Sequence, residues 1–149
     1  MRRRTFSFLS PIHKATRQIG LFLERPCAAE GVATAEGHVL SYLRSYGPCS
    51  IASLLHVFGH KPSTATSLLQ RLADRGLITR RPSKEDRRLV LIRLTRRGAA
   101  AADRLRRTLA SLEASIRSRL EESEIEGFRA VMNAIQEVTH APAGKESKP

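Results

Sequence analysis

Residues 62–98 read PSTATSLLQRLADRGLITRRPSKEDRRLVLIRLTRRG, and the spacing of apolar residues changes within this stretch. As far as Gly76 the apolar residues recur every three or four positions, which predicts a helix that starts at Pro62. Beyond Gly76, two short runs rich in Leu, Ile and Val lie on either side of a turn-forming cluster at residues 82–86. This second pattern predicts an antiparallel β-hairpin.

Three more helices are expected before this stretch. The first has Ser10 as its N-cap and stops at Pro26, and the second has Thr34 as its N-cap. The third runs from its N-cap Ser50 to Gly59, and a short turn then leads into the helix described above. Two helices joined by a short turn and followed by a hairpin are typical of a winged helix-turn-helix.

Two helices are expected after the hairpin. Thr95 can cap a long helix over residues 96–120, whose apolar positions form a stripe suited to packing against another helix. Ser123 and Glu126 have the spacing of a capping box for the last helix. The long helix would extend beyond what one small domain can cover, so we predict that the terminal helices form a homodimer surface.

The expected fold is therefore mainly α, with a two-stranded β-hairpin as the wing. Residues 34–98 would form the winged helix-turn-helix lobe, and residues 10–33 and 99–140 the helical dimerisation region. Residues 1–9 are expected to be a flexible basic N-terminus, and residues 141–149 a disordered tail.

The positive charge of the chain is concentrated in the lobe. The chain has 26 Lys and Arg against 14 Asp and Glu, a net charge of +12, and residues 61–98 account for two thirds of this excess. Such a local excess is typical of a surface that binds a polyanion. Two cysteines exclude a disulfide scaffold, and no apolar run approaches the about 18 residues of a membrane helix.

The outer face of the helix that starts at Pro62 has the chemistry of a DNA-reading surface. Its polar residues are Ser63, Thr64, Thr66, Ser67, Gln70 and Arg71. Small hydroxyl side chains allow close approach to the major groove, Gln70 can pair with adenine, and Arg71 can reach guanine or a phosphate. The N–H groups at the helix starts near Ser50, Ser63 and Thr64 favour phosphate oxygens.

The tip of the hairpin is the second candidate surface. It carries Lys84, Arg87 and Arg88, and a thin cationic loop fits the minor groove of DNA. Asp86 is expected to pair with the guanidinium of Arg88 and to orient it, because a carboxylate suits the forked donor of arginine.

Three motifs together resemble those of the MarR (multiple antibiotic resistance regulator) family. They are Leu72-x-x-Arg75-Gly76-Leu77, Asp86-Arg87-Arg88 and Leu94-Thr95-x-x-Gly98. The resemblance covers roughly residues 10–140 and implies a homodimer on a pseudo-palindromic operator, with the helix in the major groove and the wing in the minor groove. It also implies a cleft between the dimer helices and the lobe, for a small aromatic or phenolic effector.

The expected function is that of a sequence-specific transcriptional regulator of the bacterial cytoplasm and nucleoid, a repressor released by a ligand or an oxidant. Cys27 is the candidate for oxidant sensing, although an inert thiol is the simpler interpretation. Two alternatives stay open: a winged-helix architectural protein that binds DNA without sequence preference, and a protein–protein adaptor. The five histidines are scattered and no catalytic arrangement occurs, so we expect no enzyme activity, metal site or cofactor.

Overall fold

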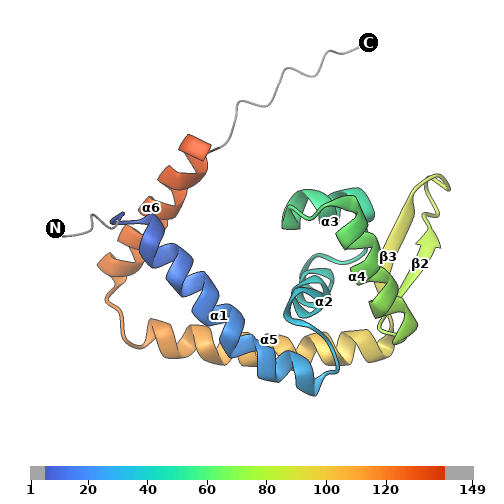
Figure 1. The fold of residues 1–149 in the computed structure, drawn as a ribbon, viewed down its shortest axis with the longest axis horizontal. Coiled ribbons are helices and arrows are strands. Elements are labelled where there is room, and N and C mark those ends of the chain that lie inside the picture. The colour runs from blue at the N-terminus through green and yellow to red at the C-terminus, as the bar shows by residue number, and fades with distance from the viewer. Residues whose placement is uncertain (1–5, 140–149) are drawn as a thin grey trace, which may run out of the picture.

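The computed structural model describes residues 6–139, and most of them are helical (Figure 1). The helices and strands are, in chain order, α1 (Leu9–Ala29), α2 (Thr34–Tyr46), β1 (Cys49–Ser50), α3 (Ile51–Phe58), α4 (Pro62–Asp74), β2 (Ile78–Pro82), β3 (Val90–Leu94), α5 (Arg96–Arg117) and α6 (Glu122–Thr139). In Figure 1, α2, α3, α4 and the strands form one lobe, and the long helix α5 leads from this lobe to α6. The predicted fold, mainly α with a winged helix-turn-helix, is confirmed.

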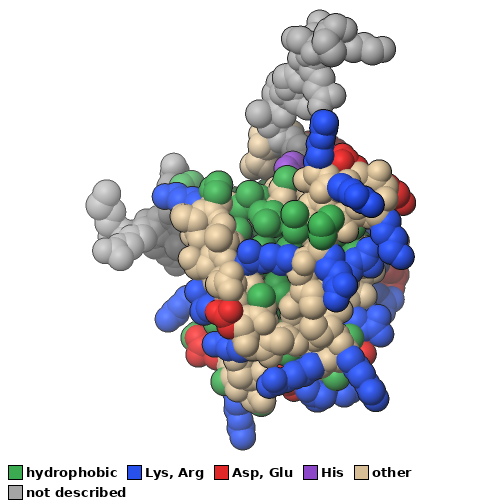
Figure 2. Space-filling view, turned by 90° about the vertical axis from the view of Figure 1, so that its right-hand side faces the viewer, with side chains coloured by type: hydrophobic (Ala, Val, Ile, Leu, Met, Phe, Trp, Pro, Cys, Tyr) green, Lys and Arg blue, Asp and Glu red, His purple; other side chains and the backbone are tan. Residues whose placement is uncertain are grey.

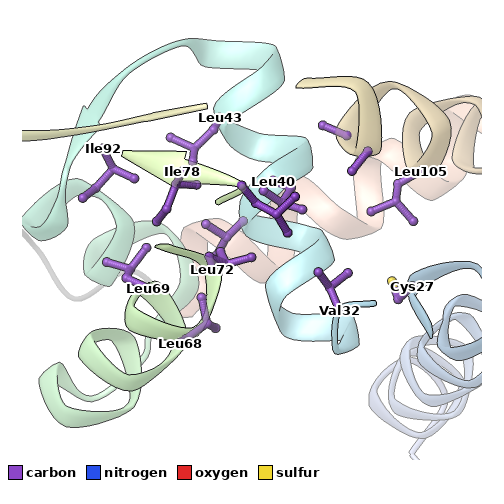
Figure 3. Packing of buried hydrophobic residues seen from close by; sticks show 14 of the residues in the cluster. Cys27, Val32, Leu40, Leu43, Leu68, Leu69, Leu72, Ile78, Ile92 and Leu105 are labelled. Atoms are coloured by element: carbon purple, nitrogen blue, oxygen red, sulfur yellow. The ribbon is translucent and has the colours of Figure 1, made fainter. Parts of the chain in front are cut away.

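A cluster of buried aliphatic side chains holds the lobe together (Figure 3). Leu40 of α2, Leu72 of α4 and Ile92 of β3 are completely buried in it. The buried residues of α4 are the predicted apolar stripe, Ala65, Leu68, Leu69 and Leu72. Because this stripe packs against α2, α3 and β2, the opposite face of α4 stays in solvent.

The sheet has three antiparallel strands in the order β1-β3-β2. The predicted hairpin is present, with pairs running from Ile78↔Leu94 to Pro82↔Val90. The third strand, β1, was not predicted: Cys49 pairs with Ile92 and thereby adds β1 at the edge of the hairpin. A strand of two residues has no periodicity, so the sequence pattern could not indicate it.

A tight junction joins the wing to α5. The hydroxyl of Thr95 donates to the carbonyl oxygen of Gly76 (2.7 Å) and accepts from the N–H of Gly98 (3.0 Å), so Thr95 caps α5 as predicted. A Cβ added at Gly98 would lie 1.8 Å from the carbonyl oxygen of Leu77. Glycine is required at this position because the wing backbone occupies the space of a side chain.

The first helix differs from its prediction at both ends. It starts at Leu9 rather than after Ser10, and it continues through Pro26 to Ala29. Proline removes one backbone hydrogen bond from a helix interior. The helix nevertheless continues because Leu23 and Cys27, on either side of Pro26, are buried and their burial offsets this cost.

Two predicted helix caps were wrong by one or two residues. The N-cap of α2 is Ala33 rather than Thr34, and its N–H donates to the carboxylate of Glu36 (2.9 Å). At the start of α6, the N–H of Glu121 donates to Glu124 (2.8 Å), in place of the predicted pair Ser123 and Glu126. In both cases a glutamate three residues into the helix replaces a side-chain cap.

The predicted tail at residues 141–149 lies outside the described residues, as do the first five residues of the predicted flexible N-terminus. The remainder of that N-terminal segment includes Leu9, which already belongs to α1. None of the helices within residues 6–139 is long and apolar enough to cross a membrane.

Candidate nucleic-acid interface

The exposed face of α4 brings together the residues that the sequence singled out. Ser63, Thr64, Thr66, Ser67, Gln70 and Arg71 are all exposed. Helix geometry places Ser63, Ser67 and Gln70 along the middle of this face, directly opposite the buried stripe, with Thr66 and Arg71 on its two edges. Small side chains therefore occupy the part of α4 that would come closest to a partner.

Intrahelical contacts hold two of these side chains. The hydroxyl of Thr66 donates to the carbonyl oxygen of Pro62 (2.9 Å), one turn earlier. The amide nitrogen of Gln70 donates to Asp74 (2.8 Å), and its carbonyl oxygen accepts no hydrogen bond from the residues that the structure describes. Asp74 was not among the predicted site residues, although its position four residues after Gln70 was a usable signal.

The starts of α3 and α4 differ in how they are capped. The hydroxyl of Ser50 accepts from the N–H of Ser53 (3.1 Å), which confirms Ser50 as the N-cap of α3. Lys61 caps α4 without a side-chain hydrogen bond, and Pro62 follows it. The N–H groups of Ser63 and Thr64 precede the first hydrogen bond of α4 and so can bind an anion.

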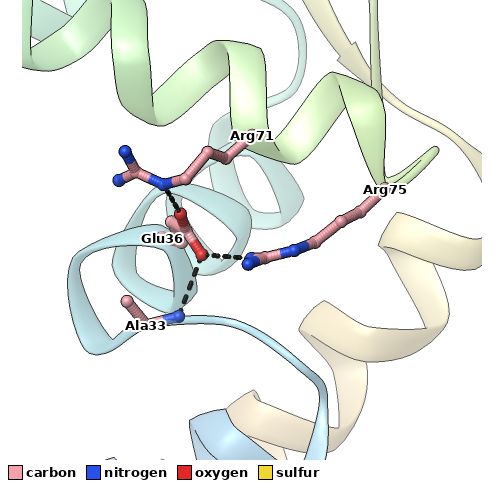
Figure 4. A network of polar contacts seen from close by, with 4 residues as sticks. All are labelled: Ala33, Glu36, Arg71 and Arg75. Atoms are coloured by element: carbon pink, nitrogen blue, oxygen red, sulfur yellow. Dashed lines mark hydrogen bonds and ion pairs between the residues drawn. The ribbon is translucent and has the colours of Figure 1, made fainter.

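Arg71 is not free, because its Nε lies 2.6 Å from Oε1 of Glu36 on α2 (Figure 4). The other carboxylate oxygen, Oε2, accepts from Nη1 of Arg75 (2.6 Å) and from the N–H of Ala33. Glu36 is 1% exposed, whereas the two arginine side chains are about half exposed. The C-terminal half of α4 is therefore tied to the start of α2 by charge-assisted hydrogen bonds.

The pKa of Glu36 reflects two opposing effects. Burial would raise the pKa, but the hydrogen bonds from Ala33, Arg71 and Arg75 outweigh it and hold the pKa below its usual value of 4.5. Glu36 is therefore ionised at neutral pH. The sequence analysis missed this residue; the usable signal was an isolated acid in a segment with few charges, together with two arginines four residues apart on α4.

The wing tip is exposed and cationic. Lys84, Arg87 and Arg88 are exposed and form no ion pair with any residue in the described range 6–139. The predicted pairing of Asp86 with the Arg88 guanidinium was wrong, since Asp86 accepts from the backbone N–H of Arg88 (2.9 Å). Asp86 thus shapes the turn, which leaves the guanidinium of Arg88 available to a partner.

Lys and Arg dominate the charged groups on this side of the molecule. Figure 2 views the side on which Figure 1 shows α4 and the wing, and it shows many basic side chains with few acidic ones among them. This agrees with the charge excess of residues 61–98. The polar face of α4 lies beside a surface that attracts a polyanion.

Cys27 has the environment of an unreactive thiol. Its side chain is buried, and a Cβ added at Gly37 would lie 2.7 Å from its Sγ. Burial first, and then the negative charge of Glu30, raise the pKa of the thiol, although a hydrogen bond with Thr34 partly offsets them. Because the thiolate is the reactive form, these surroundings do not favour oxidant sensing.

The fold, the exposed polar helix and the cationic hairpin define a winged helix-turn-helix protein. Residues 34–90 match the model of the MarR family. The match covers most of the winged helix-turn-helix lobe, so this part of the chain is similar to members of that family.

Individual proteins show the same similarity. The HTH-type transcriptional regulator YwhA of Bacillus subtilis is 29% identical over 119 residues, which are 80% of this chain and 83% of the relative. The HTH-type transcriptional repressor NicR of Pseudomonas putida is 31% identical over 87 residues, 58% of this chain and 54% of the relative. The S. aureus MepR–DNA complex has the same fold, with a TM-score of 0.79 at 19% identity over 90% of this chain and 99% of that one.

Proposed function

We propose that this protein is a homodimeric repressor that binds a pseudo-palindromic operator, with α4 in the major groove and the wing in the minor groove. The proposal is carried by the exposed polar face of α4, which lies beside a cationic wing. Arg87 and Arg88 of the wing form no ion pair with any residue in the range 6–139. NicR, a similar protein, is a repressor by name, and MepR, of the same fold, forms a complex with DNA. The protein would act in the bacterial cytoplasm, on the nucleoid, without catalysis or a cofactor.

The interface divides into base-reading and phosphate-binding groups in this proposal. Three residues lie in the middle of the exposed face of α4: Ser67 and Gln70 would meet base edges, whereas Ser63 has a free N–H at the helix start that favours a phosphate. The other α4 residues and Ser50 would contact phosphates or the groove edge: Ser63, Thr64, Thr66 and Arg71. Lys84, Arg87 and Arg88 would enter the minor groove, held in place by the turn that Asp86 closes.

Selection of bound duplexes from a random pool tests this function. A two-fold symmetric motif is expected, because one α4 helix contacts too few base pairs for a useful specificity ratio. Retention of duplexes without any shared motif would favour the architectural alternative. Failure to retain any duplex would favour the adaptor.

Replacing Arg88 with alanine is expected to weaken duplex binding by about 1–3 kcal/mol, because the exposed guanidinium would meet the minor groove. Fluorescence anisotropy with a selected duplex measures the change. Arg119→Ala is the matched control, since Arg119 is also exposed but lies between α5 and α6. Equal affinity of Arg88→Ala and wild type would remove Arg88 from the interface.

The proposed dimer surface consists of apolar side chains at the two ends of the chain. No residue of α6 is buried, and large apolar side chains are exposed on and beside α1, α5 and α6: Phe6, Phe8, Leu9, Ile19, Leu21, Phe22, Ile116, Leu120, Phe128 and Val138. Exposed apolar area of this extent marks a protein–protein interface.

Phe128→Glu is expected to convert the dimer to a monomer, because it places a charge among apolar side chains of a self-complementary interface. Light scattering coupled to gel filtration measures the mass. Glu126→Gln, two residues away on the same helix, should stay dimeric. A dimeric Phe128→Glu protein would place the interface elsewhere.

A cleft of about 730 Å³ between α1, α2 and α5 is the proposed effector site. Tyr42 and Leu109 contribute apolar surface, and the charged lining residues are Arg106 and Arg107 together with Asp103 and Glu113. These groups suit a small aromatic or phenolic compound, the proposed effector. A coupling of about 2–3 kcal/mol between this cleft and the DNA interface would release the operator.

Ala110→Trp is expected to fill this cleft, since Ala110 lines it and is exposed. A panel of phenolic and aromatic acids should release wild-type protein from a selected duplex and leave the variant bound. Unchanged release of the variant would exclude the cleft as the effector site.

A further inference from the structure

Among residues 6–139, Glu36 is the one charged residue that is fully buried. Its bond to the N–H of Ala33 serves the start of α2, but a capping glutamate does not need to be buried. The rest of its hydrogen-bonding capacity is directed at α4, through Arg71 and Arg75. Burial of a carboxylate is costly unless it is paired, so this arrangement calls for a role beyond capping.

Arg71 is held by one nitrogen only. Its Nε donates to Glu36 at 2.6 Å, and its two terminal nitrogens make no hydrogen bond to any residue that the structure describes. In Figure 4 these terminal nitrogens point away from the carboxylate. The Arg71 side chain is 51% exposed. Its planar guanidinium group therefore offers two terminal nitrogens to a partner at the edge of the exposed face of α4.

We infer that Glu36 is a positioning residue for DNA binding, which holds the guanidinium of Arg71 in the orientation that binds a backbone phosphate. This inference rests on the proposed function. A phosphate is the expected contact because Arg71 lies at the edge of the exposed face, whereas Ser67 and Gln70 occupy its middle. Holding Nε in advance reduces the side-chain entropy that an arginine loses on binding.

A double-mutant cycle on a random-sequence duplex of about 30 base pairs tests the inference, because a phosphate contact does not depend on sequence. Glu36→Gln is expected to weaken binding about threefold to tenfold, the cost of immobilising a free arginine. Arg71→Ala should weaken it about tenfold and reduce the slope of log K against log salt by about 0.9. The double variant should bind like Arg71→Ala, since Glu36 acts only through Arg71.

The outcomes separate positioning from a general loss of structure. The inference is overturned if the double variant loses affinity by the product of the two single-variant factors. It is also overturned if Arg71→Ala keeps the wild-type slope of log K against log salt. Glu30→Gln is the matched control, because Glu30 is also largely buried but pairs with Arg104 on α5; its affinity should stay near wild type. Absence of any duplex binding by the wild-type protein would instead contradict the proposed function.

Arg71→Lys covers the case in which Glu36→Gln does not fold. It leaves a cation beside Glu36, so the thermal midpoint should stay close to that of the wild type. A lysine has one ammonium group and cannot offer separate nitrogens to Glu36 and to a phosphate, so affinity should fall about threefold. Wild-type affinity of this variant would overturn the inference.

Discussion

Gly98→Ala is expected to destabilise the protein by about 3 kcal/mol or more, the upper end of the cost of overpacking. The new Cβ would lie 1.8 Å from the carbonyl oxygen of Leu77 and 2.8 Å from its carbonyl carbon. Relief requires movement of backbone, because no flexible side-chain end is involved. That movement would also break the two hydrogen bonds through which Thr95 joins the wing to α5.

Urea unfolding followed by circular dichroism measures this effect. Gly127→Ala is the matched control: Gly127 lies inside α6, and apart from its chain neighbours and its own helix backbone no atom of residues 6–139 lies within 4 Å of the Cβ position. That control should be unchanged or slightly more stable, because alanine favours helix over glycine by up to about 1 kcal/mol. Equal stability of the two variants would show that the junction at Leu77 adapts without strain.

The double variant Arg71→Ala/Arg75→Ala is expected to lose about 3 kcal/mol of stability at neutral pH, the low end of the cost of leaving a buried charge unpaired. Glu36, which is 1% exposed in the wild type, would keep only the hydrogen bond from Ala33. Chemical denaturation of both proteins measures the difference.

The pH dependence of this loss gives a second, sharper signature. In the wild type the pKa of Glu36 is depressed, so the stabilisation is present above the usual carboxyl pKa of 4.5 and is lost as the pH falls through the lower folded-state pKa. In the variant, burial raises the pKa of Glu36 without opposition from the arginines. Acid then protonates Glu36 and removes the cost of a buried, unpaired charge. The stability difference between the two proteins should therefore shrink as the pH falls from 7 towards 4.

Arg44→Ala/Arg117→Ala is the control for the removal of two arginines from ion pairs. Their partners, Asp103 and Glu122, are 40% and 58% exposed, and exposed pairs contribute at most about 1 kcal/mol each. If this control loses as much stability as Arg71→Ala/Arg75→Ala, burial of Glu36 is not the cause of the loss.

The residues proposed to touch DNA could be identified from sequence because they are exposed and lie on one helix and one hairpin. Ser67, Gln70 and Arg88 follow directly from the exposed side of α4 and the tip of the wing. What those residues contact inside the protein could not be identified in the same way. The carboxylate that binds Arg71 comes from residue 36, and the binding of Asp86 to a backbone N–H rather than to a guanidinium depends on the turn that residues 83–89 adopt.

The helices α3 and α4, the hairpin and the cap Thr95 were all encoded locally, because apolar period, caps and turn residues act over a few neighbouring positions. Pairings between distant segments have no such local signal. Three such pairings join residues about 20 to 45 positions apart: β1 with β3, Gly98 with Leu77, and Glu36 with the arginines of α4. They exist only because the packed core brings those segments together. The continuation of α1 through Pro26 has the same origin: burial of Leu23 and Cys27 outweighs the local preference of proline to end a helix.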